Sequence, residues 1–218
     1  MRAAVIHEHG GPGSVEIDNN FPDPTPEADD VIVKIGATSL NYHDIFTRRG
    51  MPGIKVPMPC IMGLDFAGEI VAVGSNVRGW KIGQRVLCDP VDRAGGGGLM
   101  GEMWHGGLAE YTRVPTHHLL ALPDTITFEQ ASCLPVAYGT AYRMMYTIGD
   151  VQEGDRVLIL GASGGVGTCA VRLAKARGCE VIACASSQAK LDLLFGIGAD
   201  HGINYTQEKF HKWIFEKY

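Results

Sequence analysis

The glycine-rich stretch "VLILGASGGVG", residues 157–167, constrains the fold of this chain more than any other feature of its sequence. The apolar run at its start suits a strand that is buried on both faces. The next residues, "VGTCAVRLAKARG", have helical periodicity up to a closing Gly178. A glycine-rich turn between a strand and a helix is typical of a unit that binds a dinucleotide through its pyrophosphate.

The glycines of this turn have separate physical roles. Gly161 permits the tight turn, and Gly167 allows the helix to pack closely on the sheet. Gly164 and Gly165 let the backbone approach a phosphate, which the amides and the positive dipole end of the helix would hold. The spacing departs from G-x-G-x-x-G, because two residues intervene before Gly164. The alternative is a glycine turn without a ligand.

The residues after the next predicted strand, "EVIACA", bear on the choice of nucleotide. An Asp or Glu at this place usually meets the free ribose hydroxyls of NAD. This chain has Ser186 and Ser187 instead, followed by Lys190. A lysine contact to a 2′-phosphate is a charge-assisted bond worth about 1.5–3 kcal/mol. The pattern favours NADPH. The alternative interpretation is that Lys190 is only a solvated residue on the surface of a helix.

The second part of the chain predicts a parallel sheet. After "EVIACA" come a predicted helix, "QAKLDLLFGIGA", and a third strand, "HGINY". Strands that alternate with helices form parallel sheets through right-handed crossovers. A complete dinucleotide-binding fold has two such halves, whereas this chain ends after about one, at "KWIFEKY". We therefore expect a piece of a longer protein.

Residues 1–122 have a different pattern of apolar residues from the remainder of the chain. Short apolar segments are separated by Gly and Pro, and Val31, Val33 and Ile35 fall on one face at period two. This pattern predicts a small antiparallel barrel or sandwich. The run Gly95–Gly98 predicts a mobile loop.

Composition excludes several classes of function. The net charge of −5 argues against nucleic acid or an acidic membrane surface as partner. The six cysteines contain no C-x-x-C pair, which favours buried thiols in a reducing cytoplasm over a secreted disulfide framework. The sequence "MRAAVIHEHGG" does not look like a signal peptide, and no run approaches the ~18 apolar residues of a membrane span. We expect a soluble, cytoplasmic protein.

The chain resembles the medium-chain dehydrogenase/reductase superfamily, and within it the zinc-free quinone oxidoreductase branch. The resemblance rests on an ordered set of motifs: "MRAAVIHEHGGPGSVEI", "LNYHDIFTRRG", "GLDFAGEIVAVGSNV", "GGLAEY", "LPVAYGTAYRMM" and "VLILGASGGVG". It implies a GroES-like catalytic domain at 1–122, followed by an incomplete Rossmann domain at 123–218. The full-length protein is expected to be a homodimer.

The resemblance also predicts that no catalytic metal is bound. The positions that match zinc ligands in metal-dependent relatives are Asn41, Leu64 and Val136, and a catalytic zinc needs three N, S or carboxylate ligands. The structural zinc lobe of such relatives needs four cysteines after Cys88, where this chain has none before Cys133. The pairs His7/His9 and His117/His118 could bind a metal adventitiously, but neither fits a catalytic spacing.

The implied reaction is hydride transfer from NADPH to a quinone or an α,β-unsaturated carbonyl. Without a metal, hydrogen-bond donors must meet the charge that develops on the carbonyl oxygen, and the candidates are Asn41, Tyr42 and His43. His43 is either the proton donor or a bystander. It would be a bystander if this segment is only the start of a helix, where Asp44 caps the helix or pairs with Arg48.

The resemblance places further residues at the cofactor: Thr140 near the nicotinamide, Val166 with its glycine neighbours under the pyrophosphate, and Tyr205 with the serines and Lys190 at the adenosine phosphate. Two rival functions stay open. One is a non-catalytic NADPH-binding protein of the same fold, and the other is a metal-dependent alcohol dehydrogenase.

Overall fold

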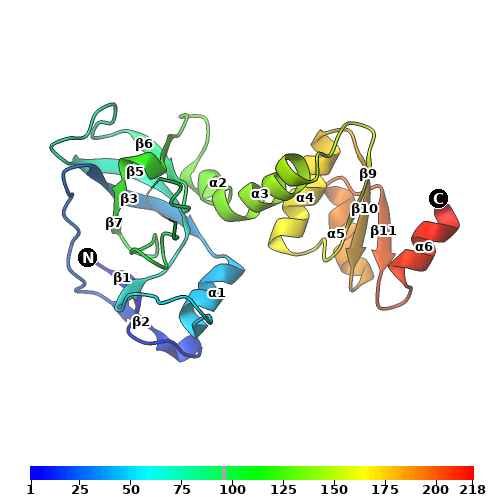
Figure 1. The fold of residues 1–218 in the computed structure, drawn as a ribbon, viewed down its shortest axis with the longest axis horizontal. Helices are drawn as coiled ribbons and strands as arrows, with labels where there is room; N and C mark the ends of the chain where they lie inside the picture. The colour runs from blue at the N-terminus through cyan, green and yellow to red at the C-terminus, as the bar shows by residue number, and fades with distance from the viewer. Residues whose placement is uncertain (95–96) are drawn as a thin grey trace. The chain divides into compact units, whose positions relative to one another are not determined.

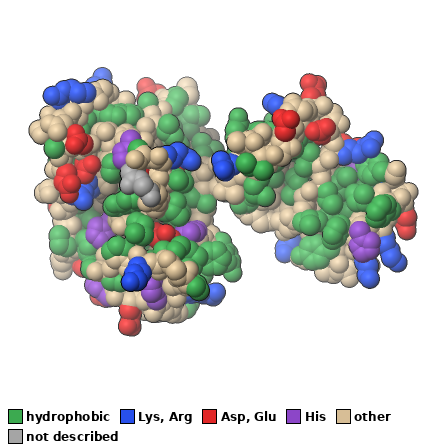
Figure 2. All heavy atoms as spheres, in the orientation of Figure 1, with side chains coloured by type: hydrophobic (Ala, Val, Ile, Leu, Met, Phe, Trp, Pro, Cys, Tyr) green, Lys and Arg blue, Asp and Glu red, His purple; other side chains and the backbone are tan. Residues whose placement is uncertain are grey.

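The computed structural model describes residues 1–94 and 97–218, which form two compact units, Met1–Val136 and Ala137–Tyr218. Gly95 and Gly96 of the predicted glycine loop lie outside the described residues. Within the described chain, no helix combines the length and apolar character needed to cross a membrane. Acidic and basic side chains share the visible face of each unit (Figure 2).

The first unit is built on antiparallel sheets, as the alternating pattern predicts (Figure 1). The larger sheet has the strand order β7-β3-β5-β6-β8, and a smaller one has the order β2-β1-β4. The strands are β1 (Ala3–Ile6), β2 (Val15–Asp18), β3 (Asp30–Ser39), β4 (Cys60–Ile61), β5 (Asp65–Val73), β6 (Arg85–Cys88), β7 (Tyr111–Pro115) and β8 (Leu119–Ala121). The helical segments are η1 (Pro12–Ser14), α1 (Tyr42–Arg49), η2 (Thr116–His118) and α2 (Phe128–Ser132).

The core of this unit follows the period-two pattern of β3. Val31 and Val33 are fully buried and pack with Phe66 and Ile70 of β5, while Ile35 is only partly buried. Helix α2 packs directly on the sheet at Gly36 of β3. A Cβ added there would lie 2.2 Å from the ring of Phe128 of α2, so only glycine leaves room for the helix. The compact unit therefore extends past residue 122, where the sequence pattern changes, to Val136.

The second unit contains a parallel sheet of order β11-β10-β9. Its strands are β9 (Arg156–Ile159), β10 (Glu180–Ala185) and β11 (His201–Asn204), and its helices are α4 (Gly165–Ala176), α5 (Gln188–Gly196) and α6 (Phe210–Lys217). Helix α3 (Pro135–Tyr142) continues into the π-helical segment η3 (Arg143–Ile148). The strand–helix alternation predicted from residue 155 onward is confirmed.

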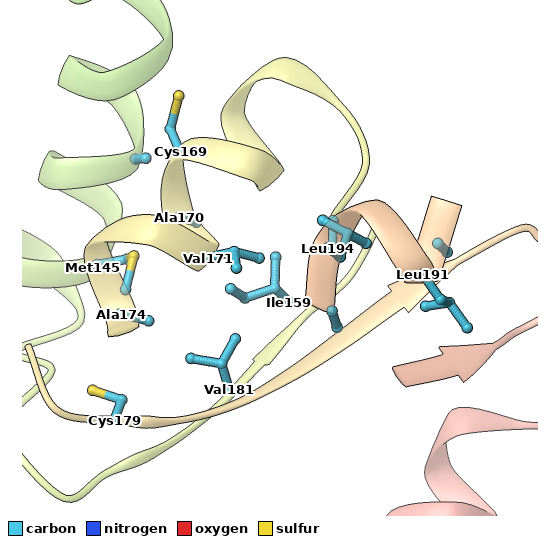
Figure 3. Packing of buried hydrophobic residues seen from close by; sticks show 14 residues of the cluster. Met145, Ile159, Cys169, Ala170, Val171, Ala174, Cys179, Val181, Leu191 and Leu194 are labelled. Carbon is cyan, nitrogen blue, oxygen red and sulfur yellow. The ribbon is translucent and has the colours of Figure 1, made fainter. Parts of the chain in front are cut away.

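Side chains of β10 alternate between the two faces of this sheet. Val181 packs with α4 and α5, and Figure 3 shows it pointing into the same space as Val171 and Ile159. Ile182 lies on the other face with Ile203 and α6. A strand covered on both faces reads as a continuous apolar run, which is why "EVIACA" is recognisable from the sequence. Five of the six cysteines are buried and Cys133 is exposed, all as free thiols.

Candidate functional site

The glycine turn of the second unit is shaped by one residue with positive φ and one close approach of the backbone. Gly161 has φ +61°, a conformation that favours glycine. A Cβ at Gly167 would lie 2.6 Å from the Gly161 carbonyl oxygen and 2.7 Å from the Ala162 Cα. Helix α4 therefore packs against the turn at a distance that only glycine permits.

The start of α4 is open on its outer side. A Cβ added at Gly165 would meet no atom within 4 Å, and Gly164 at the N-cap makes no side-chain capping hydrogen bond. The first amides of a helix, here including that of Val166, have no partner within the helix. Open space, uncapped amides and a positive dipole end together suit the pyrophosphate of a dinucleotide. The residues present therefore fit the pyrophosphate of a dinucleotide.

The predicted adenosine-side residues gather where β10 and β11 end. The two strands pair in parallel up to Ala185 and Asn204, so the residues directly after them lie at one edge of the sheet. Lys190 Nζ donates a hydrogen bond of 2.9 Å to Ser186 Oγ, and Ser187 is the N-cap of α5. The Tyr205 amide donates to the Ala185 carbonyl at 3.1 Å, and half of its surface is exposed.

Thr140 belongs to another element, helix α3. Its side chain is exposed, whereas its neighbour Ala141 is buried in the core of the second unit. Among the described residues, no side-chain hydrogen bond joins Thr140 to the glycine turn. Its role near the nicotinamide stays a prediction.

In the first unit, Asn41 is the N-cap of α1 and is held by two acids. Its backbone N–H donates a hydrogen bond to Asp44 Oδ2 at 2.7 Å, and its side-chain Nδ2 donates one to Asp65 Oδ2 at 2.9 Å. Asp44 thus caps the helix, as one of the alternatives predicts. No ion pair joins Asp44 to Arg48 in the described part of the chain.

Asp65 is the centre of this arrangement, although the sequence patterns did not single it out. It is completely buried and also accepts hydrogen bonds from Ser39 Oγ at 3.3 Å and the Val136 amide at 3.1 Å. Burial raises the pKa of its carboxyl to about 6, while the hydrogen bonds from Asn41, Val136 and Ser39 act in the opposite direction. An acid between apolar residues, in "GLDFAG", was the available signal.

The same contacts test whether a catalytic zinc fits. The Asn41 side chain and the Val136 backbone amide each donate a hydrogen bond to Asp65, and Leu64 is next to Asp65 in the chain. Leu64 and Val136 offer no donor atoms, and the Asp65 oxygens already accept bonds from the surrounding groups. These residues do not fit a catalytic zinc held by three protein ligands.

His43 is held by a second acid that the sequence patterns missed. Its Nε2 lies 2.6 Å from Glu102 Oε2, and the Glu102 side chain is 5% exposed against 25% for His43. Glu102 is 59 positions away in a loop, and nothing in the sequence links the two. Tyr42, by contrast, is 66% exposed and packs edge-on against Phe46, with ring centroids 5.1 Å apart.

Glu102 also lies in the wall of a cavity of about 770 Å³ within the first unit. Met58, Cys60 and Trp104 line the same cavity. Of the described residues that line this cavity, Glu102 is one and His43 is not. Glu102 therefore contacts the His43 imidazole and also lines this cavity.

Comparison with known families divides the chain in the same way. Residues 27–124 match the alcohol dehydrogenase GroES-like domain, and residues 165–218 match the zinc-binding dehydrogenase family. A 2-methylene-furan-3-one reductase of Solanum lycopersicum is 37% identical over 96% of this chain and 53% of its own length. The chloroplastic NADPH-dependent alkenal/one oxidoreductase of Arabidopsis thaliana is 35% identical over 95% of this chain and 53% of its own length. The chain thus spans about half the length of these curated relatives.

Solved structures agree on the fold. An NAD-dependent alcohol dehydrogenase superposes with a TM-score of 0.88 at 34% identity, covering 94% of this chain and 64% of that one. The Escherichia coli quinone oxidoreductase complexed with NADPH superposes with a TM-score of 0.87 at 25% identity, covering 100% of this chain and 62% of that one. With an antiparallel GroES-like unit followed by a Rossmann-type parallel sheet, the chain belongs to the medium-chain dehydrogenase/reductase superfamily.

Proposed function

We propose that this protein is an NADPH-dependent oxidoreductase that reduces a quinone or an α,β-unsaturated carbonyl without a catalytic zinc. The observation that carries the proposal is the open, uncapped start of α4, together with the Ser186–Lys190 pair after β10. The names of the relatives support the same substrate class: a 2-methylene-furan-3-one reductase, an NADPH-dependent alkenal/one oxidoreductase and a quinone oxidoreductase.

The preference for NADPH rests on the end of β10. No acid stands between Ala185 and Lys190, and the lysine ammonium already lies against the Ser186 hydroxyl. A 2′-phosphate placed there would accept a charge-assisted bond from Lys190 and a hydrogen bond from a serine. The two structural neighbours differ in their coenzymes, NAD in one and NADPH in the other, so this pair of residues is the argument specific to this chain.

The proposed chemistry needs groups that meet negative charge and supply a proton. NADPH, when bound, supplies the hydride. The charge that then develops on the carbonyl oxygen is met by preorganised donors, each worth about 2.7–4 kcal/mol. Asp65 fixes the Asn41 carboxamide, and Glu102 holds Nε2 of His43, which leaves Nδ1 as the ring atom that exchanges a proton with the substrate.

The absence of zinc from this proposal rests on the donor set around Asp65. Leu64 and Val136 occupy two of the three positions that match metal ligands in zinc-dependent relatives, and neither side chain has a donor atom. A metal-dependent alcohol dehydrogenase is therefore the weaker alternative. Homodimer formation and a cytoplasmic location stay predictions.

Turnover measurements test the proposal. The protein is mixed with NADPH or NADH and a panel of quinones and enones, and decay of nicotinamide absorbance is followed with and without a chelator. We expect oxidation of NADPH in preference to NADH, unaffected by the chelator. Nucleotide binding with no turnover on any acceptor would instead support a non-catalytic NADPH-binding protein. Alcohol oxidation that the chelator abolishes would support the alcohol dehydrogenase alternative.

A further inference from the structure

Three metal-binding side chains converge in the first unit, outside the proposed reaction site. Asp92, His117 and His118 each place one possible ligand atom within 4.8 Å of those of the other two. Asp92 and His118 are buried, whereas His117 is exposed. The sequence shows the two adjacent histidines, but it does not show that a carboxylate joins them.

The backbone holds the three residues in place. The Asp89 amide donates to the His118 carbonyl at 2.8 Å, and His118 Nδ1 lies 2.7 Å from the Asp89 carbonyl oxygen. This reciprocal pair ties the loop after β6 to η2. Asp92 Oδ1 accepts from the Ala94 amide at 3.0 Å, which orients the carboxylate. The cluster therefore has a fixed frame.

The geometry of each histidine suits a ligand. A carbonyl oxygen can only accept, so His118 Nδ1 carries the proton and Nε2 keeps its lone pair in the neutral ring. A ligating histidine typically donates its other N–H to a carbonyl or carboxylate in this way. His117 Nε2 lies 3.1 Å from Asp92 Oδ1. Two ligands about 2.0–2.1 Å from a tetrahedral zinc ion are separated by roughly 3.4 Å, so this pair needs little movement.

We propose that Asp92, His117 and His118 bind a divalent transition-metal ion of the Zn²⁺ type. Two imidazoles and one carboxylate suit such an ion, whereas Mg²⁺ and Ca²⁺ prefer oxygen ligands alone. The exposed side of His117 leaves room for water as a further ligand. The ion would link the loop after β6 to η2, and it takes no part in hydride transfer. The rival reading is a plain His117–Asp92 ion pair beside a hydrogen-bonded His118.

Calorimetric titration of the chelator-treated protein with Zn²⁺ alone tests the site. We expect one equivalent to bind, and the unfolding midpoint to rise with Zn²⁺ concentration. The variant His117→Gln changes an exposed side chain, so it should fold normally and bind Zn²⁺ at least about tenfold more weakly. The matched control is His7→Gln, which removes another exposed histidine that lies beside an acid, 3.9 Å from Glu16.

Co²⁺ gives an independent readout, because the visible absorption of the bound ion reports its ligands. The spectrum should appear with one equivalent in the protein and in His7→Gln, and it should be lost or altered in His117→Gln. Absence of Zn²⁺ binding, or equal binding by the protein and His117→Gln, would overturn the proposal. Because the site lies outside the proposed chemistry, NADPH turnover should be the same before and after chelation.

Discussion

Asp65 gives the clearest residue-scale prediction, because its environment disfavours its charge. Its pKa in the folded protein is about 6 against a usual 3.8, chiefly through burial. The folded state therefore holds this proton more tightly than the unfolded state does. The stability that protonated Asp65 contributes is present below about pH 4 and is lost as the pH rises through 6, by an amount of the order of 3 kcal/mol.

The variant Asp65→Asn isolates this effect, because it keeps an acceptor for Asn41 and Val136 but cannot ionise. The free energy of unfolding, measured by urea titration from pH 4 to 7, should fall relative to the variant as the pH rises. The difference between the two proteins removes the contributions of the other carboxyls. Parallel stability curves would contradict the prediction.

Glu102 is predicted to position His43 for proton exchange. The variant Glu102→Gln keeps the shape but removes the charge that faces Nε2 at 2.6 Å. If the proposed function holds, kcat should fall by about 10²-fold, the lower end of the range for general acid–base catalysis, and the pH profile of kcat should shift. The KM for NADPH should not change. An unchanged pH profile would mean that Glu102 has only a structural role. The control is Glu16→Gln, which changes an exposed acid beside His7 in the same way.

Lys190 is predicted to select the phosphorylated coenzyme. Lys190→Ala removes a charge-assisted bond of about 1.5–3 kcal/mol, so the Kd for NADPH should rise roughly 10- to 100-fold while that for NADH stays the same. Fluorescence titration with both nucleotides measures this. Lys212→Ala, an exposed lysine of the same unit, is the control. Equal weakening of both nucleotides would show that Lys190 does not contact the 2′-phosphate.

At the scale of the elements, two glycines at the start of α4 should separate folding from binding. Gly167→Ala puts a Cβ 2.6 Å from the Gly161 carbonyl oxygen, and that backbone cannot move without disturbing the turn. We expect a loss of about 1–3 kcal/mol in the free energy of unfolding. Gly165→Ala meets nothing within 4 Å, so it should fold normally yet bind NADPH more weakly, because its methyl occupies the space left for the pyrophosphate.

Thermal unfolding and NADPH titration of both variants check this difference. Gly196→Ala, which also meets nothing within 4 Å, controls for adding a methyl group to the second unit. Normal stability in Gly167→Ala would contradict the close packing of α4 on the turn. Normal NADPH affinity in Gly165→Ala would contradict the placement of the pyrophosphate.

The elements of the second unit could be predicted because their signals are local. A continuous apolar run, a glycine turn and a helical period each lie within a short window, as in β9 and α4. The acids that hold the proposed catalytic residues could not be predicted in this way. Asp65 is 24 positions from Asn41, and Glu102 is 59 positions from His43. The antiparallel register of β3 and β5 pairs Ser39 with Asp65, and this pairing brings the buried acid to the start of α1.

At the scale of the whole molecule, each unit has a core of its own. The buried clusters around Phe66 and around Val171 share no residues, and each belongs to one unit. The two proposed ligands should therefore leave separate signatures in hydrogen exchange. NADPH should protect amides at the start of α4 and at the ends of β10 and β11, since the pyrophosphate and adenosine phosphate are proposed to bind there.

Zn²⁺, added without nucleotide, should protect residues 89–94 and 116–118, where the loop after β6 meets η2. Hydrogen exchange is measured with each ligand alone, by mass spectrometry of peptides. It distinguishes Zn²⁺ binding near η2 from Zn²⁺ binding at the proposed reaction site. Protection by Zn²⁺ around Asn41 and Asp65 instead would place the metal among the proposed catalytic groups. That result would contradict both the metal-free reduction mechanism and the separate metal site, because a cation there would take over the role assigned to Asn41 and His43.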